Sequence, residues 1–368
     1  MLTSFKIQNF RPFRHLQIER LGQINLIAGK NNVGKSSLLE ALRLYAHRGA
    51  PAIIWEILSG RNEISRSSDA NSDNGSDIRL SIEHLFYGRK QFASDQEPIQ
   101  IGPVDSMEDT LSIAPEWHFE SRDENGTPLN IDFFRDEEAI KELQTTGLTI
   151  RMGSQFKKKY SLRFLMTPRA MTEEASTGKE INCAHVSANG LNKSEIGRLW
   201  DNIALTDLEQ DVLAALRIIA PEVERLSLLG EPKSGRGRIA VVKTAGHTRP
   251  IPLNSMGDGM NRIFGYMLAL VNARDGILLI DEIENGIHYS VQPNLWASIF
   301  NAAYHLNVQV FATTHSWDCI TSFQKVASES KEIDGMLIRL EAKREMTNAV
   351  LFDERELSIV SRDQIEVR

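Results

Sequence analysis

The sequence has few cysteines and no long apolar run, and these two shortages narrow the classes of protein that it can encode. Only two of its 368 residues are cysteines, Cys183 and Cys319, and they lie far apart. They form neither a CxxC pair nor a disulfide framework, so a reducing compartment is expected. No stretch approaches the roughly 18–20 consecutive apolar residues of a membrane span. The N-terminus lacks the apolar segment of a signal peptide, and we expect a cytoplasmic protein with no membrane partner.

Positive charge is also in short supply. Lys and Arg together number 42 against 49 Asp and Glu, for a net charge of −7. This balance excludes a surface coated with cations for nucleic acid, although a local basic groove stays open. Two groups of cations are candidates for contacts with DNA or RNA phosphates. The simpler explanation is that these side chains lie on a solvent-exposed face. They are Arg151, Lys157, Lys158, Lys159 and Arg163 in the first group, and Lys233, Arg236, Arg238 and Arg249 in the second.

The remaining composition is that of an ordinary globular protein, with 41% hydrophobic and 25% charged residues. His84, His118 and His185 have no partners at the spacing of zinc ligands, so we expect no zinc site. The sequence also contains no nucleophile elbow, no Cys/His pair and no internal repeat. The chemistry must therefore come from other motifs.

The first 47 residues have the pattern of strand, loop and helix. Apolar and polar side chains alternate over 5–10, and 16–18 is a second short strand candidate. The run 24–28 is apolar and ends in a glycine-containing loop. From Ser36 onward, apolar residues recur at helical spacing.

The loop at 29–36, GKNNVGKS, matches the phosphate-binding pattern GxxxxGK[ST] at every fixed position. Its glycines allow backbone N–H groups to turn toward phosphate oxygens at the positive end of the following helix. Lys35 would reach the β- and γ-phosphates of ATP, and the Ser36 hydroxyl would bind Mg²⁺. The residues expected to bind the nucleotide are Gly29, Asn31, Asn32, Val33, Gly34, Lys35, Ser36 and Ser37.

A second motif is the apolar strand 277–280, which ends in Asp281 and Glu282. In a nucleotide-binding fold Asp281 would hold Mg²⁺, directly or through water, and Glu282 would orient or deprotonate the attacking water. Alone, this pattern is more often a strand that meets solvent. Together with the phosphate loop it predicts ATP hydrolysis.

The middle of the chain is less informative. Residues 60–77 are polar and Gly-rich, which predicts a surface loop, and 78–165 contain short alternating strands that predict an antiparallel lobe. Residues 190–220 have helical periodicity, and 224–252 are weakly strand-like. The last third alternates helices with the apolar strands at 277–280 and 308–312, which indicates a mainly parallel sheet with helices on both faces.

The turn LNSMGDG at 253–259 precedes an amphipathic helix. It is either an anion-binding turn or a simple N-cap by Asn254 or Ser255. The order of motifs favours the first. Phosphate loop, Ser-x-Gly-x-Gly at 255–259, LLIDE at 278–282 and TTHS at 313–316 together resemble the ATP-binding-cassette (ABC) ATPase head.

The resemblance is to the SMC/RecF/OLD branch of these ATPases, and within it to the AAA_15 and AAA_21 types. The opening INLIAGKNNVGKSSLLEAL and the segment ENGIH at 284–288 carry it, and it covers 1–47 and 250–320. It implies a P-loop NTPase of ABC type with a mainly parallel sheet flanked by helices, an antiparallel β lobe and a helical insertion. The expected divisions are 1–59 and 226–368 for the ATPase core, 60–165 for the inserted loop and lobe, and 166–225 for the helical insertion.

The resemblance also implies roles for particular residues. Ser255, Gly257 and Gly259 would form the signature turn, which contacts the γ-phosphate held by a second copy of the chain. Met256 and Asp258 depart from the usual Leu-Ser-Gly-Gly pattern of that turn. His315 would sense the γ-phosphate and act with Lys35 and Glu282 in catalysis. The glutamine that usually completes the Mg²⁺ shell stays open among Gln91, Gln96, Gln100 and Gln155.

From this resemblance we expect a Mg²⁺-dependent ATPase that sandwiches ATP between two copies, as a homodimer or a higher oligomer. About 50 residues follow His315, too few for the nuclease domain of OLD proteins. We therefore expect a separately encoded effector such as a nuclease, as in bacterial anti-phage defence. The alternatives are a RecF- or SMC-like DNA repair ATPase that grips DNA itself, a transporter's ATP-binding subunit, and a nucleotide sensor that does not hydrolyse.

Overall fold

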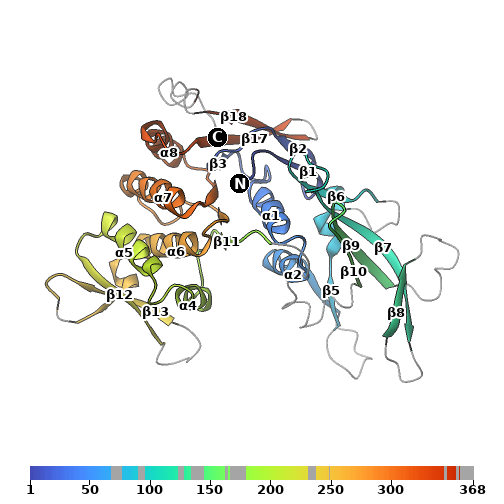
Figure 1. Ribbon diagram of the computed structural model, residues 1–368, viewed down its shortest axis with the longest axis horizontal. Helices are drawn as coiled ribbons and strands as arrows, with labels where there is room; N and C mark the ends of the chain where they lie inside the picture. The colour runs from blue at the N-terminus through green and yellow to red at the C-terminus, as the bar shows by residue number, and fades with distance from the viewer. Residues whose placement is uncertain are drawn as a thin grey trace.

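The computed structural model describes residues 1–67, 77–89, 96–122, 128–133, 145–161, 165, 180–230, 238–247, 249–343, 346–353 and 356. Figure 1 shows an arch in which two lobes descend from a central layer of strands. One lobe contains a second sheet, and the other contains a group of helices and a small three-stranded sheet. No helix in the described part is long and apolar enough to cross a membrane.

The central layer is a six-stranded sheet in the order β11-β15-β16-β3-β17-β18. Its first five strands are parallel, and β18 runs antiparallel to β17. Three of the strands, β15, β16 and β3, are buried along their whole length, which confirms the predicted mainly parallel sheet covered on both faces. The strands are β11 (Cys183–Val186), β15 (Ile277–Ile280), β16 (Gln309–Thr313), β3 (Ile24–Ala28), β17 (Gly335–Lys343) and β18 (Met346–Phe352).

Helices cover both faces of this sheet and create two hydrophobic cores. On one face α1 (Lys35–Ala46) and α2 (Pro51–Gly60) lie between the parallel sheet and the antiparallel one. On the other face lie α6 (Asp258–Asn272), α7 (Gln292–Leu306) and α8 (Trp317–Glu329). The strand side chains divide accordingly, because neighbouring residues of a strand point to opposite faces.

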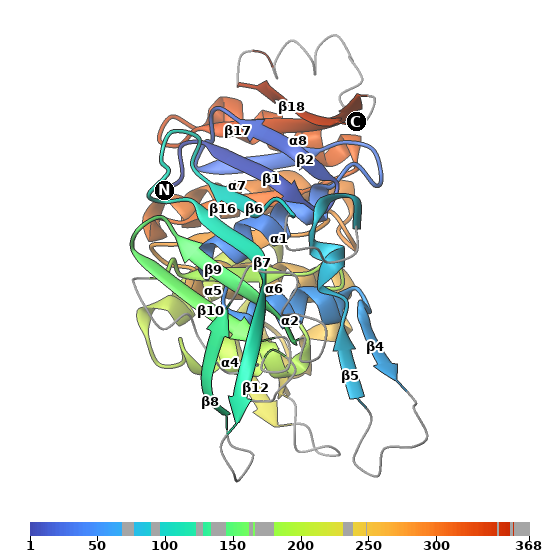
Figure 2. The same ribbon diagram turned by 90° about the vertical axis from the view of Figure 1, so that its right-hand side faces the viewer.

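The second sheet is antiparallel, in the order β10-β9-β7-β6-β1-β2, with β8 paired to β7. Figure 2 shows this sheet facing the viewer. The predicted antiparallel lobe is therefore present, and its strands continue the sheet of the two N-terminal strands. The strands are β1 (Phe5–Phe10), β2 (Phe13–Ile18), β6 (Ile99–Gly102), β7 (Leu111–Arg122), β8 (Pro128–Phe133), β9 (Thr145–Met152) and β10 (Phe156–Ser161).

The segment predicted as a surface loop at 60–77 contains regular structure. Strand β4 (Ile64–Ser67) pairs antiparallel with β5 (Asp77–Leu80), and 68–76 lie outside the described residues. The loop prediction was wrong for 64–67, because pairing with a distant strand overrides the weak strand preference of a polar segment.

The region predicted as helical contains two helices and one strand. Helices α4 (Lys193–Asp201) and α5 (Asp207–Ile219) follow the predicted periodicity, and Asn192 begins α4 with a capping box to Glu195. The range 166–225 also contains β11, which is part of the central sheet. Beyond it lies the three-stranded sheet of β12 (Val223–Gly230), β13 (Arg238–Thr244) and β14 (Ile251–Pro252).

Strand β11 places His185 in a cleft that Arg43 and His47 also line. Burial lowers the pKa of His185 from 6.5 to about 3, and the charge of Arg43 acts in the same direction. Between these two values the unfolded chain binds a proton that the folded chain excludes, so stability rises with pH across this window and is lost on acidification. On going from pH 7 to pH 5, the wild type should therefore lose about 2 kcal/mol more of its free energy of unfolding than His185→Gln does. Urea unfolding of both proteins at the two pH values measures this difference, and equal losses would contradict it.

Candidate active site

The phosphate loop connects β3 to α1, and glycine is required at both ends of it. Gly29 and Gly34 have φ angles of 146° and 108°, which lie in the region that favours glycine. A Cβ atom on Gly29 would lie 2.7 Å from the carbonyl oxygen of Leu340, and one on Gly34 would lie 2.6 Å from the ring of Phe13. The backbone can therefore turn tightly enough to bring its N–H groups to the start of α1.

Lys35 is the first residue of α1, and its side chain folds back over the loop. Its Nζ donates to the carbonyl oxygens of Gly29, at 2.7 Å, and Lys30, at 3.1 Å. Burial lowers the pKa of Lys35, and this effect is opposed first by the negative charge of Glu282 and then by that of Asp281. The ammonium group thus lies between the phosphate loop and the acidic end of β15.

The two carboxylates after β15 are held by residues from neighbouring segments. The Thr313 hydroxyl, at the end of β16, donates to Asp281 Oδ1 at 2.5 Å and accepts from the backbone N–H of Glu282 at 2.8 Å. The Asn285 amide donates to Glu282 Oε2 at 2.6 Å. Glu282 has a φ of 50°, an uncommon conformation for a residue other than glycine. These contacts fix the direction of both carboxylates.

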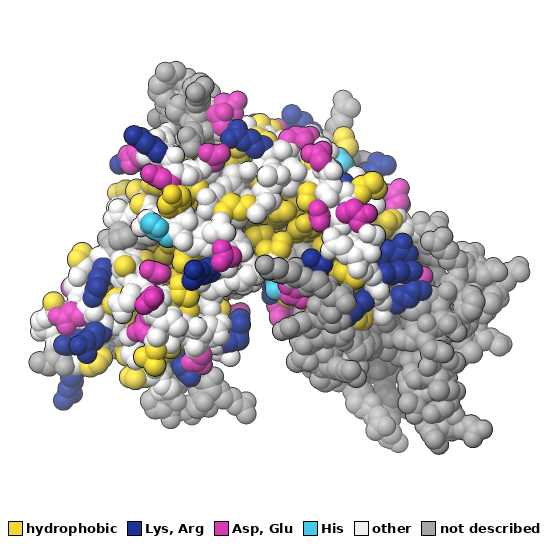
Figure 3. Space-filling view, viewed as in Figure 1, with side chains coloured by type: hydrophobic (Ala, Val, Ile, Leu, Met, Phe, Trp, Pro, Cys, Tyr) yellow, Lys and Arg dark blue, Asp and Glu magenta, His cyan; other side chains and the backbone are white. Residues whose placement is uncertain are grey.

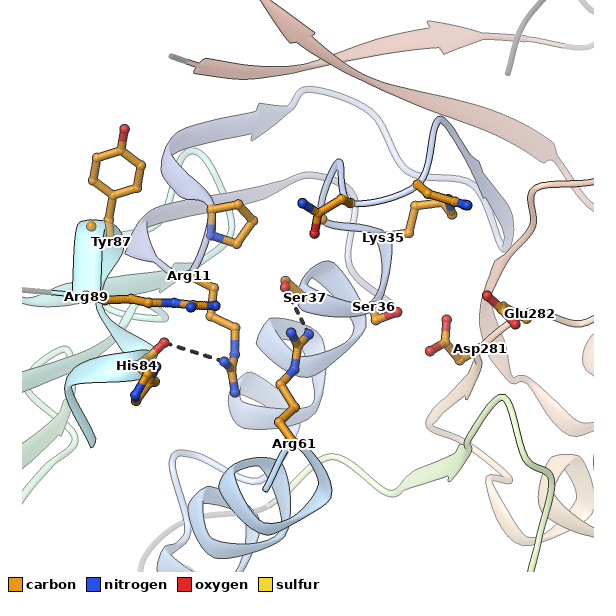
Figure 4. A pocket seen from close by; sticks show the side chains of 15 residues that line it. Arg11, Lys35, Ser36, Ser37, Arg61, His84, Tyr87, Arg89, Asp281 and Glu282 are labelled. Carbon is orange, nitrogen blue, oxygen red and sulfur yellow. Dashed lines mark hydrogen bonds between the residues drawn. The ribbon is translucent and has the colours of Figure 1, made fainter. Parts of the chain in front are cut away.

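The phosphate loop and the carboxylates line one cavity of about 630 Å³ (Figure 4). The predicted residues that line it are Asn31, Asn32, Gly34, Lys35, Ser36, Ser37, Asp281 and Glu282. Ser36 and Asp281 offer a hydroxyl and a carboxylate oxygen, the hard ligands that Mg²⁺ prefers. The donor set therefore fits Mg²⁺. The cavity lies at the carboxyl ends of parallel strands, where nucleotides bind in open α/β sheets.

The opposite wall of the cavity is cationic and aromatic, and the sequence motifs did not identify it. Figure 4 shows Arg11, Arg61 and Arg89 on this side, with His84 and Tyr87. Arg11 is buried and forms ion pairs with Glu40 and Glu63, at 2.6 and 2.9 Å. Arg61 binds the same Glu40 at 2.7 Å and donates to the Ser37 hydroxyl at 3.2 Å. In the sequence, Arg11 stands out only as a cation between Phe10 and Phe13.

His315 lies outside the cavity lining, in the loop after β16. Its Nδ1 is 3.1 Å from Glu284 Oε1, and its backbone N–H donates to the same oxygen at 2.9 Å. The imidazole is half exposed, at 49%, whereas the Glu284 side chain is only 7% exposed. The sequence motifs include Glu284 only within the ENGIH segment and predict no role for it.

The turn at 255–259 is exposed and does not line the cavity of its own chain. A short 3₁₀ helix, η5 (Leu253–Met256), leads to Gly257, which is the N-cap of α6 and has a φ of 101°. No side chain caps α6, so the alternative in which Asn254 or Ser255 is the cap was wrong. A Cβ atom on Gly259 would lie 3.0 Å from the Gly286 carbonyl oxygen, so glycine lets α6 approach the loop that follows Glu282.

None of the glutamines proposed for the Mg²⁺ shell that the structure describes, Gln96, Gln100 and Gln155, lines the cavity; Gln91 lies outside the described residues. The strand that ends beside Asp281 is β11, since the Asp281 N–H donates to the Val186 carbonyl. The residues next to the carboxylates are therefore Ser187 and its successors. The Ala188 carbonyl in this loop accepts from Arg262 Nη1 of α6 at 2.6 Å.

The cations proposed for nucleic-acid contact do not form one uniform patch. Lys159 pairs with Glu116 at 3.3 Å, and Arg238 pairs with Asp201. Figure 3 shows cationic and anionic side chains interspersed over the described part of one face. Arg163, Lys233 and Arg236 lie outside the described residues.

Two protein-family models match the chain. One, described as an AAA ATPase domain, matches residues 1–182. The other, described as an AAA domain, putative AbiEii toxin, type IV TA system, matches residues 193–318. Together these matches include the phosphate loop, the turn at 255–259 and the acidic end of β15.

Individual proteins and solved structures also resemble the chain. An "ATP/GTP phosphatase" of Helicobacter pylori is 21% identical over 356 residues, which cover 89% of each chain. An uncharacterized protein of Methanocaldococcus jannaschii is 42% identical over 92 residues, covering 23% of this chain and 42% of that protein. A structure of an SMC head bound to the C-winged helix domain of ScpA aligns with 96% of this chain and 97% of its own, at 12% identity and a TM-score of 0.48. An SMC head domain from Thermotoga maritima aligns with 95% and 98%, at 10% identity and a TM-score of 0.46.

Proposed function

Because the chain is an ABC-type ATPase of the AAA_15 and AAA_21 kind, we propose that two copies close head to tail around two ATP molecules and thereby regulate a separately encoded effector. The expected resemblance is confirmed by both family models, and ATP hydrolysis is the shared activity that they imply. The dimer, the metal, the roles of individual residues and the effector belong to the proposal.

The cavity supports a direct assignment of roles in hydrolysis. The triphosphate would lie along the phosphate loop, where Lys35 and the N–H groups at the start of α1 compensate its negative charge. Ser36 and Asp281 would hold Mg²⁺, which neutralises charge on the phosphate oxygens when bound. Glu282, held by Asn285 at 2.6 Å, would orient the attacking water and accept its proton.

The position of the 255–259 turn carries the dimer proposal. The turn is exposed at the start of the 15-residue helix α6 and lies outside the cavity that contains Lys35 and Glu282. The Gly257 N–H donates to the Asn254 carbonyl, but no side chain caps α6, so the N–H groups of Asp258 and Gly259 in its first turn would be available to an anion. In a head-to-tail pair, Ser255 and Gly257 of each copy would contact the γ-phosphate bound by the other. ATP would then join the two copies, and hydrolysis would release them.

The effector proposal rests on what such a cycle can do. A dimer that closes on ATP and opens after hydrolysis is a two-state switch. What the switch regulates depends on the protein attached to it. The description of the family that matches 193–318 names a putative toxin of a type IV toxin–antitoxin system, which supports a role in bacterial defence. We propose a nuclease as the effector class, in an OLD-like anti-phage system.

A capture experiment tests this proposal. Glu282→Gln, expected to trap the ATP-bound dimer, would be expressed in the native host and purified with Mg-ATP, and every co-purifying protein and nucleic acid would be identified. Lys35→Ala, which should not bind ATP, is the matched control. A stoichiometric nuclease captured only by Glu282→Gln supports the proposal. Capture of DNA without a protein partner would instead favour a DNA clamp. Capture of a membrane permease would contradict both the effector proposal and the clamp.

A further inference from the structure

Glu284 is a buried carboxylate with an incomplete set of partners. It follows Glu282 by two residues, and its Oε1 accepts the backbone N–H of His315 at 2.9 Å. Its Oε2 is buried and has no hydrogen-bond partner among the described residues. Burying such a group is costly unless its contacts compensate. Its polar contacts in the described part of the chain are both with His315.

The contact with the imidazole restricts where His315 can carry its protons. The Nδ1 atom lies 3.1 Å from this carboxylate oxygen, and the negative charge favours a hydrogen on the nitrogen that faces it. A neutral imidazole has only one N–H group, and its Nε2 would then be a bare acceptor. Phosphate oxygens are also acceptors. A neutral His315 could therefore not donate a hydrogen bond to a γ-phosphate.

We propose that Glu284 is a positioning residue that fixes His315 as an Nδ1–H donor and obliges it to meet the γ-phosphate as an imidazolium. This proposal rests on the γ-phosphate role that the family resemblance implies for His315. The hydrogen bond to phosphate would then be charge-assisted and stronger than one from a neutral ring. Glu284 would balance the imidazolium charge from the other side of the ring, which a neutral amide cannot do.

Other charged and titratable groups surround the pair and must be kept constant in the test. Lys35 of α1 is within electrostatic range of Glu284, and Asp281 and Glu282 lie in the same loop as Glu284. The negative charge of Glu284 contributes to raising the pKa of both Tyr266 of α6 and Cys319 of α8. Burial raises the pKa of Cys319 to about 12, with Glu284 acting in the same direction, and Asp318 is its neighbour. None of these is altered in the variants below.

The direct test is to observe the ring nitrogens. Two-bond ¹H–¹⁵N spectra of histidine side chains show which nitrogen carries the proton, and the signal missing from His315→Gln identifies His315. In the nucleotide-free wild type at alkaline pH, where the ring is neutral, we expect Nδ1–H. In Glu284→Gln the amide can donate to Nδ1, and we expect Nε2–H to appear. An Nε2–H ring in the wild type, or the same pattern in both proteins, would overturn the proposal.

Kinetics tests the consequence for hydrolysis. We expect Glu284→Gln to lower kcat roughly ten- to a hundredfold, as for the loss of a hydrogen bond to a charged group, with little change in KM. In a His315→Gln background the same substitution should have no further effect. An additive loss would show that Glu284 acts independently of His315. If His315→Gln left kcat unchanged, the γ-phosphate role of His315 would fail, whereas the nitrogen spectra of the free protein would still test the pairing.

Discussion

Glu282→Gln should bind ATP normally, hydrolyse it about 10²- to 10⁴-fold more slowly, and accumulate as a dimer. Removing a general base costs this much in typical enzymes. Glutamine keeps the length of the side chain and an oxygen that can accept from Asn285, so the loop should hold its shape. Only the capacity to accept a proton is lost. Single-turnover hydrolysis and light scattering in the presence of Mg-ATP measure the two effects.

The control for this variant is Glu332→Gln, which alters an exposed glutamate outside the cavity lining. It should hydrolyse ATP at the wild-type rate and show no additional dimer. Turnover by Glu282→Gln at the control rate would assign the proton acceptor to another residue. Slow hydrolysis without dimer accumulation would support Glu282 as the general base and contradict the head-to-tail dimer.

Lys35→Ala should lose at least a hundredfold in affinity for ATP. The substitution removes the cation that lies between the phosphate loop and the carboxylates of Asp281 and Glu282. It also removes the donor to the carbonyl oxygens of Gly29 and Lys30, which leaves the loop less well ordered for phosphate binding. A charge-assisted contact with phosphate is among the strongest hydrogen bonds that a protein makes. Isothermal titration calorimetry with ATP measures the loss.

Lys30→Ala is the matched control, since Lys30 belongs to the same loop but its side chain is exposed and outside the cavity lining. It removes the same charge from the chain, and its affinity for ATP should stay within a few-fold of the wild type. Thermal unfolding without nucleotide shows whether both variants are folded. Retained affinity in a folded Lys35→Ala protein would refute the assignment of the nucleotide site.

The elements that could be predicted most accurately are those whose signal is local. Strands β3 and β15 begin and end where the apolar runs 24–28 and 277–280 do. Burial on both faces leaves little room for polar residues, so such strands are visible in the sequence. The phosphate loop is also local, because its glycines and Lys35 act through the backbone of eight consecutive residues. The order of the motifs along the chain was enough to recognise the family.

Strand β11 was missed, so the residues that lie beside Asp281 were not identified from the sequence. It is four residues long and contains His185, so neither length nor periodicity marks it. Its structure is determined by parallel pairing with β15, nearly a hundred residues later in the chain. Because β11 ends beside Asp281, only this pairing identifies the residues next to the carboxylates.

The sequence by itself determined the P-loop fold, the nucleotide loop and the carboxylates at the end of β15, because each depends on neighbouring residues. Only the tertiary structure decided the cationic wall of Arg11, Arg61 and Arg89 and the contact between Glu284 and His315. The wall joins three segments, and the Glu284–His315 contact joins the loops after two adjacent strands. Which of many charged side chains meet there depends on strand order and register, and these are set by long-range pairing that leaves no periodic trace in the sequence.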